Sequence, residues 1–153
     1  MSSASSTLPR PPLKVSAGNQ IHGHVVTVER GAVNAEVLID IGGGASMVAI
    51  VTDESIDALT LRPGREVYAL VQASSVIFTT ERMPFVSARN ALWGVVDALR
   101  SGAVNDEISM RLDAGQRVTA TLTHTSVHEL GLAPGRRACA LIKASSVLLA
   151  VPA

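Results

Sequence analysis

The fold is decided by Gly31-Ala32-Val33-Asn34-Ala35-Glu36-Val37-Leu38-Ile39-Asp40-Ile41, a polar turn that leads into an aliphatic run. The same arrangement returns 71 residues later as Gly102-Ala103-Val104-Asn105-Asp106-Glu107-Ile108-Ser109-Met110-Arg111-Leu112. Outward from this stretch, residues 15–78 align without a gap with residues 86–149, and 26 of the 64 positions are identical. A repeated fold needs only a repeated apolar pattern. Short polar motifs that recur at the same offset of 71 residues therefore indicate repeated turns or a repeated function.

Each repeat is predicted to hold five short strands and one short helix. In the first repeat the strand-like runs are Ile21–Val28, Val33–Ile41, Met47–Val51, Val67–Val71 and Val76–Phe78. In the second repeat they are Leu92–Leu99, Val104–Leu112, Arg117–Leu122, Ala138–Ile142 and Val147–Leu149. Thr52, followed by two acids and then by Ser55, is typical of a helix start between the third and fourth strands. This order favours an all-β fold with short helices, built as two tandem OB-fold-like five-stranded barrels.

The predicted boundaries are a disordered tail at residues 1–13, a first repeat at residues 14–80 and a second repeat at residues 85–153. The tail is rich in Ser and Pro and lacks the apolar core of a signal peptide. A unit of about 65 residues is close to the lower limit for a self-sufficient core. Only 17% of the residues are charged, against about 25% in an average globular protein. Both features predict sizeable interfaces and a homo-oligomer.

The bulk composition argues against nucleic acid and membrane as partners. The net charge is zero, which leaves no general attraction to phosphate backbones. The four aromatic residues are too few for a row of stacking platforms. No apolar run reaches the length of a membrane span. Cys139, the single cysteine, lies in an apolar run and is interpreted as a small buried hydrophobe; with no disulfide possible within the chain, the cytoplasm is the default location.

Three polar segments of the second repeat carry complementary chemistry. Ser87-Ala88-Arg89-Asn90 alone would be a polar strand entry whose side chains satisfy backbone groups. Thr123 and Ser126 add two hydroxyls at a helix start, and Lys143 adds an ammonium group beside Ser145. This set consists of hydrogen-bond donors and contains no carboxylate. Such a set suits a compact oxyanion and does not suit a metal cation.

Taken in chain order, Ser-Ala-Arg-Asn, Gly-Ala-Val-Asn-x-Glu, Thr-x-x-Ser, Leu-Gly-Leu-x-Pro-Gly and Lys-Ala-Ser-Ser-Val resemble the Mop (molbindin) family of molybdate-binding domains. The resemblance covers residues 14–151. It implies OB-type barrels in a six-unit assembly, which is a trimer for a tandem chain, with oxyanions bound between units. The implied ligands are Ser87, Ala88 through its backbone, Arg89, Thr123, Ser126 and Lys143, with Ser145 close by.

The resemblance also implies a function. Molybdate or tungstate would be a bound ligand exchanged unchanged, with no organic cofactor, no catalytic residues and no free metal cation. The protein would store molybdenum or maintain its level in the cytoplasm. An alternative is an oxyanion-sensing module of a transporter or transcription factor, and a less favoured one is an OB-fold that binds nucleic acid.

The first repeat departs from the ligand pattern. It keeps the hydroxyl and backbone positions Ser16, Ala17, Thr52, Ser55 and Ser74. Gly18 stands at the position of Arg89, and Gln72 stands at the position of Lys143. A dianion bound there loses two charge-assisted contacts, each worth roughly 1.5–3 kcal/mol in favourable cases. We therefore expect the first repeat's own ligand set to give weak or empty sites, although its segments can complete a site of the second repeat.

Other motifs have simpler interpretations. Gly42-Gly43-Gly44 lacks the Lys and Ser or Thr of a phosphate loop and is predicted to be a hairpin turn. His22 and His24 share a strand face and would make half a metal site, but no further ligand is tied to them by pattern. His124 and His128 are four residues apart on the short helix, where a solvated face is the simpler interpretation, with His124 a weaker candidate for a pH-sensitive neighbour of the anion. The repeated Gly-Ala-Val-Asn segments are interpreted as turns and interface packing, and more weakly as the lining of a three-fold axis.

Overall fold

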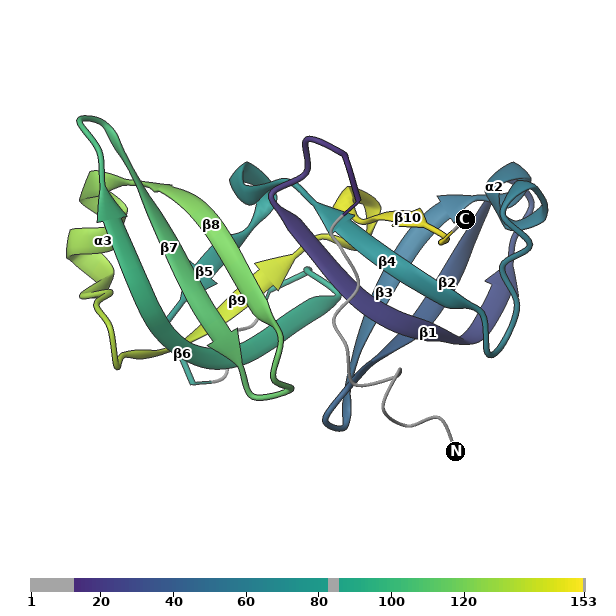
Figure 1. The fold of residues 1–153 in the computed structure, drawn as a ribbon, viewed down its shortest axis with the longest axis horizontal. Coiled ribbons are helices and arrows are strands. Elements are labelled where there is room, and N and C mark those ends of the chain that lie inside the picture. The colour runs from purple at the N-terminus through teal and green to yellow at the C-terminus, as the bar shows by residue number, and fades with distance from the viewer. Residues whose placement is uncertain (1–12, 83–85, 153) are drawn as a thin grey trace.

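A computed structural model describes residues 13–82 and 86–152, and it consists of two curled five-stranded sheets with few helical turns (Figure 1). The first repeat contains β1 (Asn19–Arg30), β2 (Asn34–Gly42), β3 (Ala45–Thr52), α2 (Asp53–Ala58), β4 (Glu66–Val71), η1 (Ala73–Ser75) and β5 (Ile77–Thr79). The second contains β6 (Asn90–Ser101), β7 (Asn105–Leu112), β8 (Arg117–Thr123), α3 (His124–Leu130), β9 (Arg137–Ile142), η2 (Ala144–Ser146) and β10 (Leu148–Ala150). The predicted fold class is confirmed. Most of the predicted tail, residues 1–12, lies outside the described residues.

The two repeats exchange their last strands. One sheet has the order β10-β4-β1-β2-β3 and the other β5-β9-β6-β7-β8, with every pair antiparallel. In Figure 1, β10 lies beside β4 in the sheet of the first repeat, although it ends the second. The registers are equivalent, since Ile77 pairs with Leu141 and Leu148 pairs with Leu70. Each sheet is therefore completed by a strand of the other repeat, an exchange that the repeat pattern does not predict.

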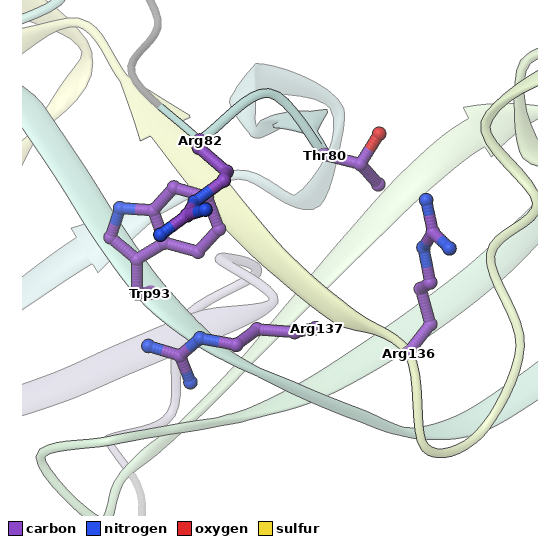
Figure 2. A pocket seen from close by; sticks show the side chains of 5 residues that line it. All are labelled: Thr80, Arg82, Trp93, Arg136 and Arg137. Carbon is purple, nitrogen blue, oxygen red and sulfur yellow. The ribbon is translucent and has the colours of Figure 1, made fainter.

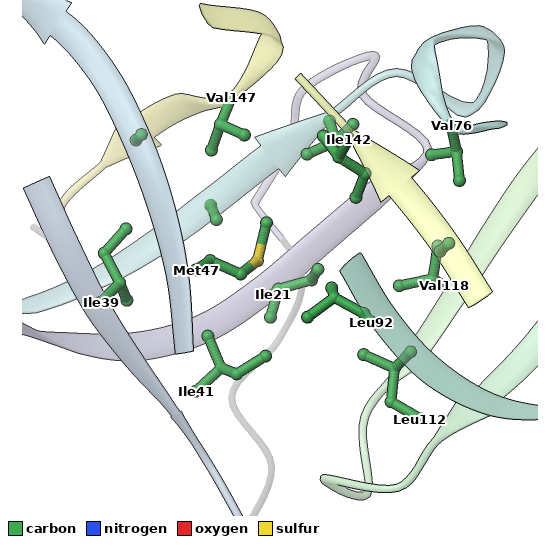
Figure 3. Close-up of a cluster of buried hydrophobic side chains, with 14 of the residues drawn as sticks. Ile21, Ile39, Ile41, Met47, Val76, Leu92, Leu112, Val118, Ile142 and Val147 are labelled. Carbon is green, nitrogen blue, oxygen red and sulfur yellow. The ribbon is translucent and has the colours of Figure 1, made fainter. Parts of the chain in front are cut away.

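One hydrophobic cluster runs through both sheets. Figure 3 shows Ile21 and Met47 of the first repeat near Leu92 and Ile142 of the second. Buried and exposed residues alternate along β2, as expected for a strand with one face on the core. Because the cluster takes residues from both repeats, neither repeat buries its core alone, in agreement with the small predicted size of each unit.

Turns and caps follow the predicted chemistry. Gly42, Gly43 and Gly44 all have positive φ angles, between 61° and 93°, and form the hairpin between β2 and β3. Thr52 caps α2 by accepting a hydrogen bond from the backbone of Ser55, and Thr123 caps α3 in the same way. The predicted helix starts are confirmed at both positions.

Asn19 and Asn90 tie the edge of each sheet to the other repeat. Asn90 donates from Nδ2 to the carbonyl of Val48 at 2.8 Å and accepts from its N–H at 2.7 Å. Asn19 makes the same pair of bonds with Thr119, at 2.8 and 2.7 Å. Val48 and Thr119 lie on β3 and β8, the outer strands of the two sheets. Each side-chain amide therefore acts as one peptide unit of a neighbouring strand and satisfies backbone groups at the sheet edge.

Cys139 is fully buried in β9, and burial raises the pKa of its thiol. This confirms its interpretation as a small core residue. We expect an aromatic disulfide reagent to label the native protein at least about 100-fold more slowly than the chain in denaturant, since labelling needs an exposed thiolate. The rate is measured by absorbance during a denaturant series. Rapid labelling of the folded protein would contradict this placement.

Candidate functional site

Arg89 and Lys143 lie at the same end of the second repeat's sheet. Asn90 of β6 pairs with Ile142 of β9, so Arg89 and Lys143 occupy the next position on each strand. Both side chains are exposed. Ser87 and Ala88 precede Arg89, while Ser145 follows Lys143 in η2. The structure thus brings together the two cations of the predicted ligand set and the Ser residues next to them.

The strand exchange directs this end of β6 to the first repeat's sheet. Asn90 binds β3, and η2 lies against the same strand. Arg89 reaches β2, where its Nη2 donates to Oε1 of Glu36 at 3.0 Å. This bond raises the pKa of the Arg89 guanidinium, and the charge of Glu29 adds to the effect. A predicted anion ligand is therefore already occupied by a carboxylate of the other repeat.

The two hydroxyls of the second repeat's helix start lie elsewhere. Thr123 pairs with Asn105, at the end of the sheet where β6 finishes at Ser101. Arg89 stands just before the first residue of β6, a strand of 12 residues that spans roughly 35–40 Å when extended. Within one chain, Thr123 and Ser126 are therefore at the opposite end of the sheet from Arg89. A site that uses both groups has to join residues of different chains.

The hydroxyl pair nearer to Arg89 along the strands belongs to the first repeat. Glu36 is opposite Ile50 in β3, and Thr52 is two residues further along that strand. Thr52 and Ser55 share a hydrogen bond of 2.8 Å between their side chains at the start of α2. The same contact joins Thr123 to Ser126, also at 2.8 Å. The two helix starts are alike in geometry but differ in their neighbours along the chain.

The corresponding end of the first repeat has no arginine or lysine at the two matching positions. Gly18 and Gln72 lie one position beyond the Asn19–Val71 pair on each strand. The neighbouring residues in sequence are Ser16, Ala17 and Ser74. The acids that follow Thr52 are partly neutralised, because Arg30 donates to Asp53 at 3.2 Å and to Asp57 at 2.9 Å. These two carboxylates raise the pKa of Arg30. Arg30 lies near the start of α2 and not at a position that matches Arg89 or Lys143, so the first repeat differs from the second at both cation positions.

The histidines have other partners. His22 binds Glu66 and meets the ring of His24 edge-on, with 5.4 Å between ring centroids. His124 bonds through Nδ1 to the buried Asp106 at 3.0 Å. Among residues 13–82 and 86–152, no three His, Cys, Asp or Glu side chains gather as a metal site would require. In the same part of the chain, no helix is long and apolar enough to cross a membrane.

Comparison with known families fits this repeated geometry. The family model of the TOBE domain matches residues 15–78 and again residues 86–149. The chain belongs to the TOBE-domain family. The two matches coincide with the two internal repeats, and the similar proteins described next confirm the resemblance to the Mop type of this domain.

Curated relatives carry names that refer to molybdenum. A molybdenum transport protein ModE of Azotobacter vinelandii is 45% identical over 139 residues, which are 91% of this chain and 52% of the relative. A molybdenum-pterin-binding protein MopA of Rhodobacter capsulatus is 44% identical over 141 residues, 92% of this chain and 53% of the relative. The chain thus spans about half the length of these relatives, so their whole activities do not transfer to it directly.

A solved structure matches over nearly the full chain. The cytoplasmic molybdate-binding protein ModG, crystallised with molybdate bound, has 46% sequence identity and a TM-score of 0.88. The alignment covers 92% of this chain and all of that chain. The tandem arrangement of two OB-like units is therefore shared with a protein of known fold.

Proposed function

We propose that this protein binds molybdate or tungstate at sites centred on Arg89 and Lys143, and that it serves molybdenum storage or homeostasis without catalysis. The observation that carries the proposal is the placement of these two cations on neighbouring strands, with Ser87 and Ser145 close to them in sequence. A guanidinium and an ammonium group supply charge and directed donors for a tetrahedral dianion. The similarity to molybdate-bound ModG supports the same ligand.

The site is proposed to be completed by a neighbouring chain in a trimer. Thr123 and Ser126 cannot reach Arg89 within one chain, so a second copy supplies a helix start to it. Exposed apolar residues occur at matching positions of the repeats, such as Val33 and Val104 at 70% and 72% exposure. Exposed aliphatic residues of this kind favour burial between copies. Sedimentation analysis tests the trimer, and a monomer that binds molybdate tightly would contradict it.

The location and the role are part of the same proposal. We place the protein in the cytoplasm, where ModG is described. Storage accounts for a chain whose candidate site consists of hydrogen-bond donors rather than a nucleophile and a base. A sensing role would use the same site, and one relative is named as a transcriptional regulator ModE, from Yersinia pestis, at 31% identity. The anion chemistry is identical in both cases.

Calorimetric titration with molybdate, tungstate and sulfate tests this function. We expect similar tight binding of the first two, since they are alike in size and charge. Sulfate is smaller, and donors placed for molybdate stay partly unfilled around it, which is unfavourable. We also expect fewer than six equivalent tight interface sites in each trimer, because only the second repeat carries the cations. Absence of molybdate binding, or equal binding of sulfate, would contradict the proposed function.

Glu36 is expected to compete with the anion for Arg89. Glu36→Gln removes the carboxylate and leaves a side chain of the same size. The ion pair is half exposed and screened by solvent, so the affinity for molybdate should rise only about 1.5- to 5-fold. The matched control is Glu107→Gln, since Glu107 occupies the same place in the second repeat but its partner position is Gly18. Weaker binding by Glu36→Gln would mean that the carboxylate orients Arg89 instead.

The first repeat is expected to gain affinity when it receives the missing cations. In Gly18→Arg with Gln72→Lys, both groups stand at the places that follow the Asn19–Val71 pair. A Cβ at residue 18 would lie 3.3 Å from the Ala73 methyl, a tight but local contact at an exposed position. Titration should show additional molybdate sites per chain, while Gly18→Gln with unchanged Gln72 should not add them. An unchanged stoichiometry would contradict the assignment of the cation positions.

A further inference from the structure

A basic pocket lies at the junction of the two repeats, apart from the Arg89 end of β6. Its lining consists of Thr80, Arg82, Trp93, Arg136 and Arg137, and its volume is about 480 Å³. This size lies within the roughly 300–1,000 Å³ that is usual for small-molecule sites. Figure 2 shows Arg82 and the guanidinium of Arg137 beside the indole of Trp93, with Arg136 and Thr80 on the other side of the pocket.

Two of the three arginines have no counter-charge. Arg137 is bound to Asp113 by two hydrogen bonds, of 3.0 and 2.6 Å, and its guanidinium carbon lies 5.5 Å from the centroid of the Trp93 ring. The guanidinium groups of Arg82 and Arg136 make no hydrogen bond or ion pair with any residue in the described ranges 13–82 and 86–152. The pocket therefore has an excess of two positive charges in a chain whose net charge is zero.

The strand exchange creates this cluster. Thr79 of β5 pairs with Cys139 of β9, so the chain that follows β5 runs beside the start of β9. Thr80 and Arg82 of the first repeat's end are thereby placed next to Arg136 and Arg137. The equivalents of Trp93 and Arg137 in the first repeat are His22 and Glu66, which bind each other. The first repeat thus has an acid where the second has a cation, and the basic pocket belongs to the second alone.

We propose that this pocket is a second anion site, which takes a small phosphorylated compound. Free arginine forks bind phosphate oxygens in pairs, and Thr80 offers a further donor. The Arg137–Asp113 pair holds one wall in place against the indole. The pocket is larger than one tetrahedral oxyanion requires, so a ligand with two linked phosphate groups fits it better than molybdate. This inference does not depend on molybdate binding at Arg89.

Trp93, the single tryptophan of the chain, reports directly on the pocket. The experiment titrates the full protein with inorganic pyrophosphate at constant ionic strength and follows tryptophan emission. We expect a saturable change in tryptophan emission. Sulfate that supplies the same concentration of negative charge should not reproduce this change. In the double variant Arg82→Gln with Arg136→Gln, the half-saturating concentration should rise at least about tenfold, because two charge-assisted contacts are lost.

Two further variants make the outcome decisive. Arg62→Gln with Arg100→Gln removes the same charge from two exposed arginines outside the pocket and should leave the pyrophosphate response unchanged. Arg89→Gln should also leave it unchanged if the pocket is separate from the molybdate site. Circular dichroism shows whether each variant is folded. The proposal is overturned by the absence of a saturable response, by a response that survives in Arg82→Gln with Arg136→Gln, or by one that is lost in Arg89→Gln.

Discussion

Arg89→Ala is expected to weaken molybdate binding about 10- to 100-fold, the largest effect on function of any single substitution in the chain. A hydrogen bond from a charged group to an anion is worth roughly 1.5–3 kcal/mol, and each 1.4 kcal/mol is about tenfold in affinity. The substitution also frees the Glu36 carboxylate, which then repels the dianion. Calorimetric titration of wild type and variant measures the change.

The variants around Arg89 separate its charge from its geometry. Arg89→Lys keeps the charge but loses the planar fork, so its affinity should lie between wild type and Arg89→Ala. Combining Arg89→Ala with Glu36→Gln removes the repulsive carboxylate and should recover part of the loss, which a double-mutant cycle quantifies. Arg62→Ala, at an exposed turn outside the site, is the control. Wild-type affinity in Arg89→Ala would remove this residue from the site.

The sequence was sufficient for the elements that depend on local chemistry. The Thr52 and Thr123 caps, the glycine hairpin and the buried Cys139 all follow from residue types at short spacings, and the structure confirms each. Such features depend on a few neighbouring residues, so one sequence contains the information needed. The paired placement of Arg89 and Lys143 also follows from strand register once β6 and β9 are recognised as neighbours.

The exchange of β5 and β10 could not be predicted from the same patterns. Both strands are three residues long and mostly apolar, and Ile77 and Leu148 make equivalent pairs with Leu141 and Leu70. Either strand therefore satisfies either sheet, and the hydrophobic pattern does not distinguish a closed repeat from an exchanged one. Because the sequence does not show which sheet each last strand joins, it also does not show which residues of the two repeats meet. The contact of Arg89 with Glu36 joins the two repeats, and the pocket beside Trp93 takes Thr80 and Arg82 from the chain that follows the exchanged β5.

The repeated Glu of the Gly-Ala-Val-Asn-x-Glu segment is the one sequence signal for the contact between Arg89 and Glu36. The sequence predicts a turn and an interface there, because a single sequence does not show which cation the glutamate faces. The two copies have different roles, since Glu36 binds Arg89, whereas the first repeat has Gly18 at the position of Arg89 and so offers no such side chain to Glu107. A glutamate repeated in both copies therefore does not imply a repeated contact, because the residue at the partner position differs.

Asn90→Ala is expected to have a large effect on stability, because it breaks one of the connections between the two sheets. The side chain is 2% exposed and makes both bonds to the backbone of Val48. Its removal leaves the N–H and the carbonyl of the half-buried Val48 without these partners, and an unsatisfied group costs about 1–3 kcal/mol when it is buried. We expect a loss of about 2–4 kcal/mol in the free energy of unfolding, measured by denaturant titration at fixed protein concentration.

Asn19→Ala should behave like Asn90→Ala, because Asn19 makes the equivalent bonds to Thr119 and is 3% exposed. Asn105→Ala is the matched control, since Asn105 is exposed at the start of β7 and should change stability by no more than about 0.5 kcal/mol. Asn90→Ala should also reduce molybdate affinity, because Arg89 is the next residue and depends on the same anchor. If stability were unchanged, the sheet edges would have to be held by other contacts. If stability fell while affinity did not, the position of Arg89 would be set by Glu36 and not by the amide of Asn90.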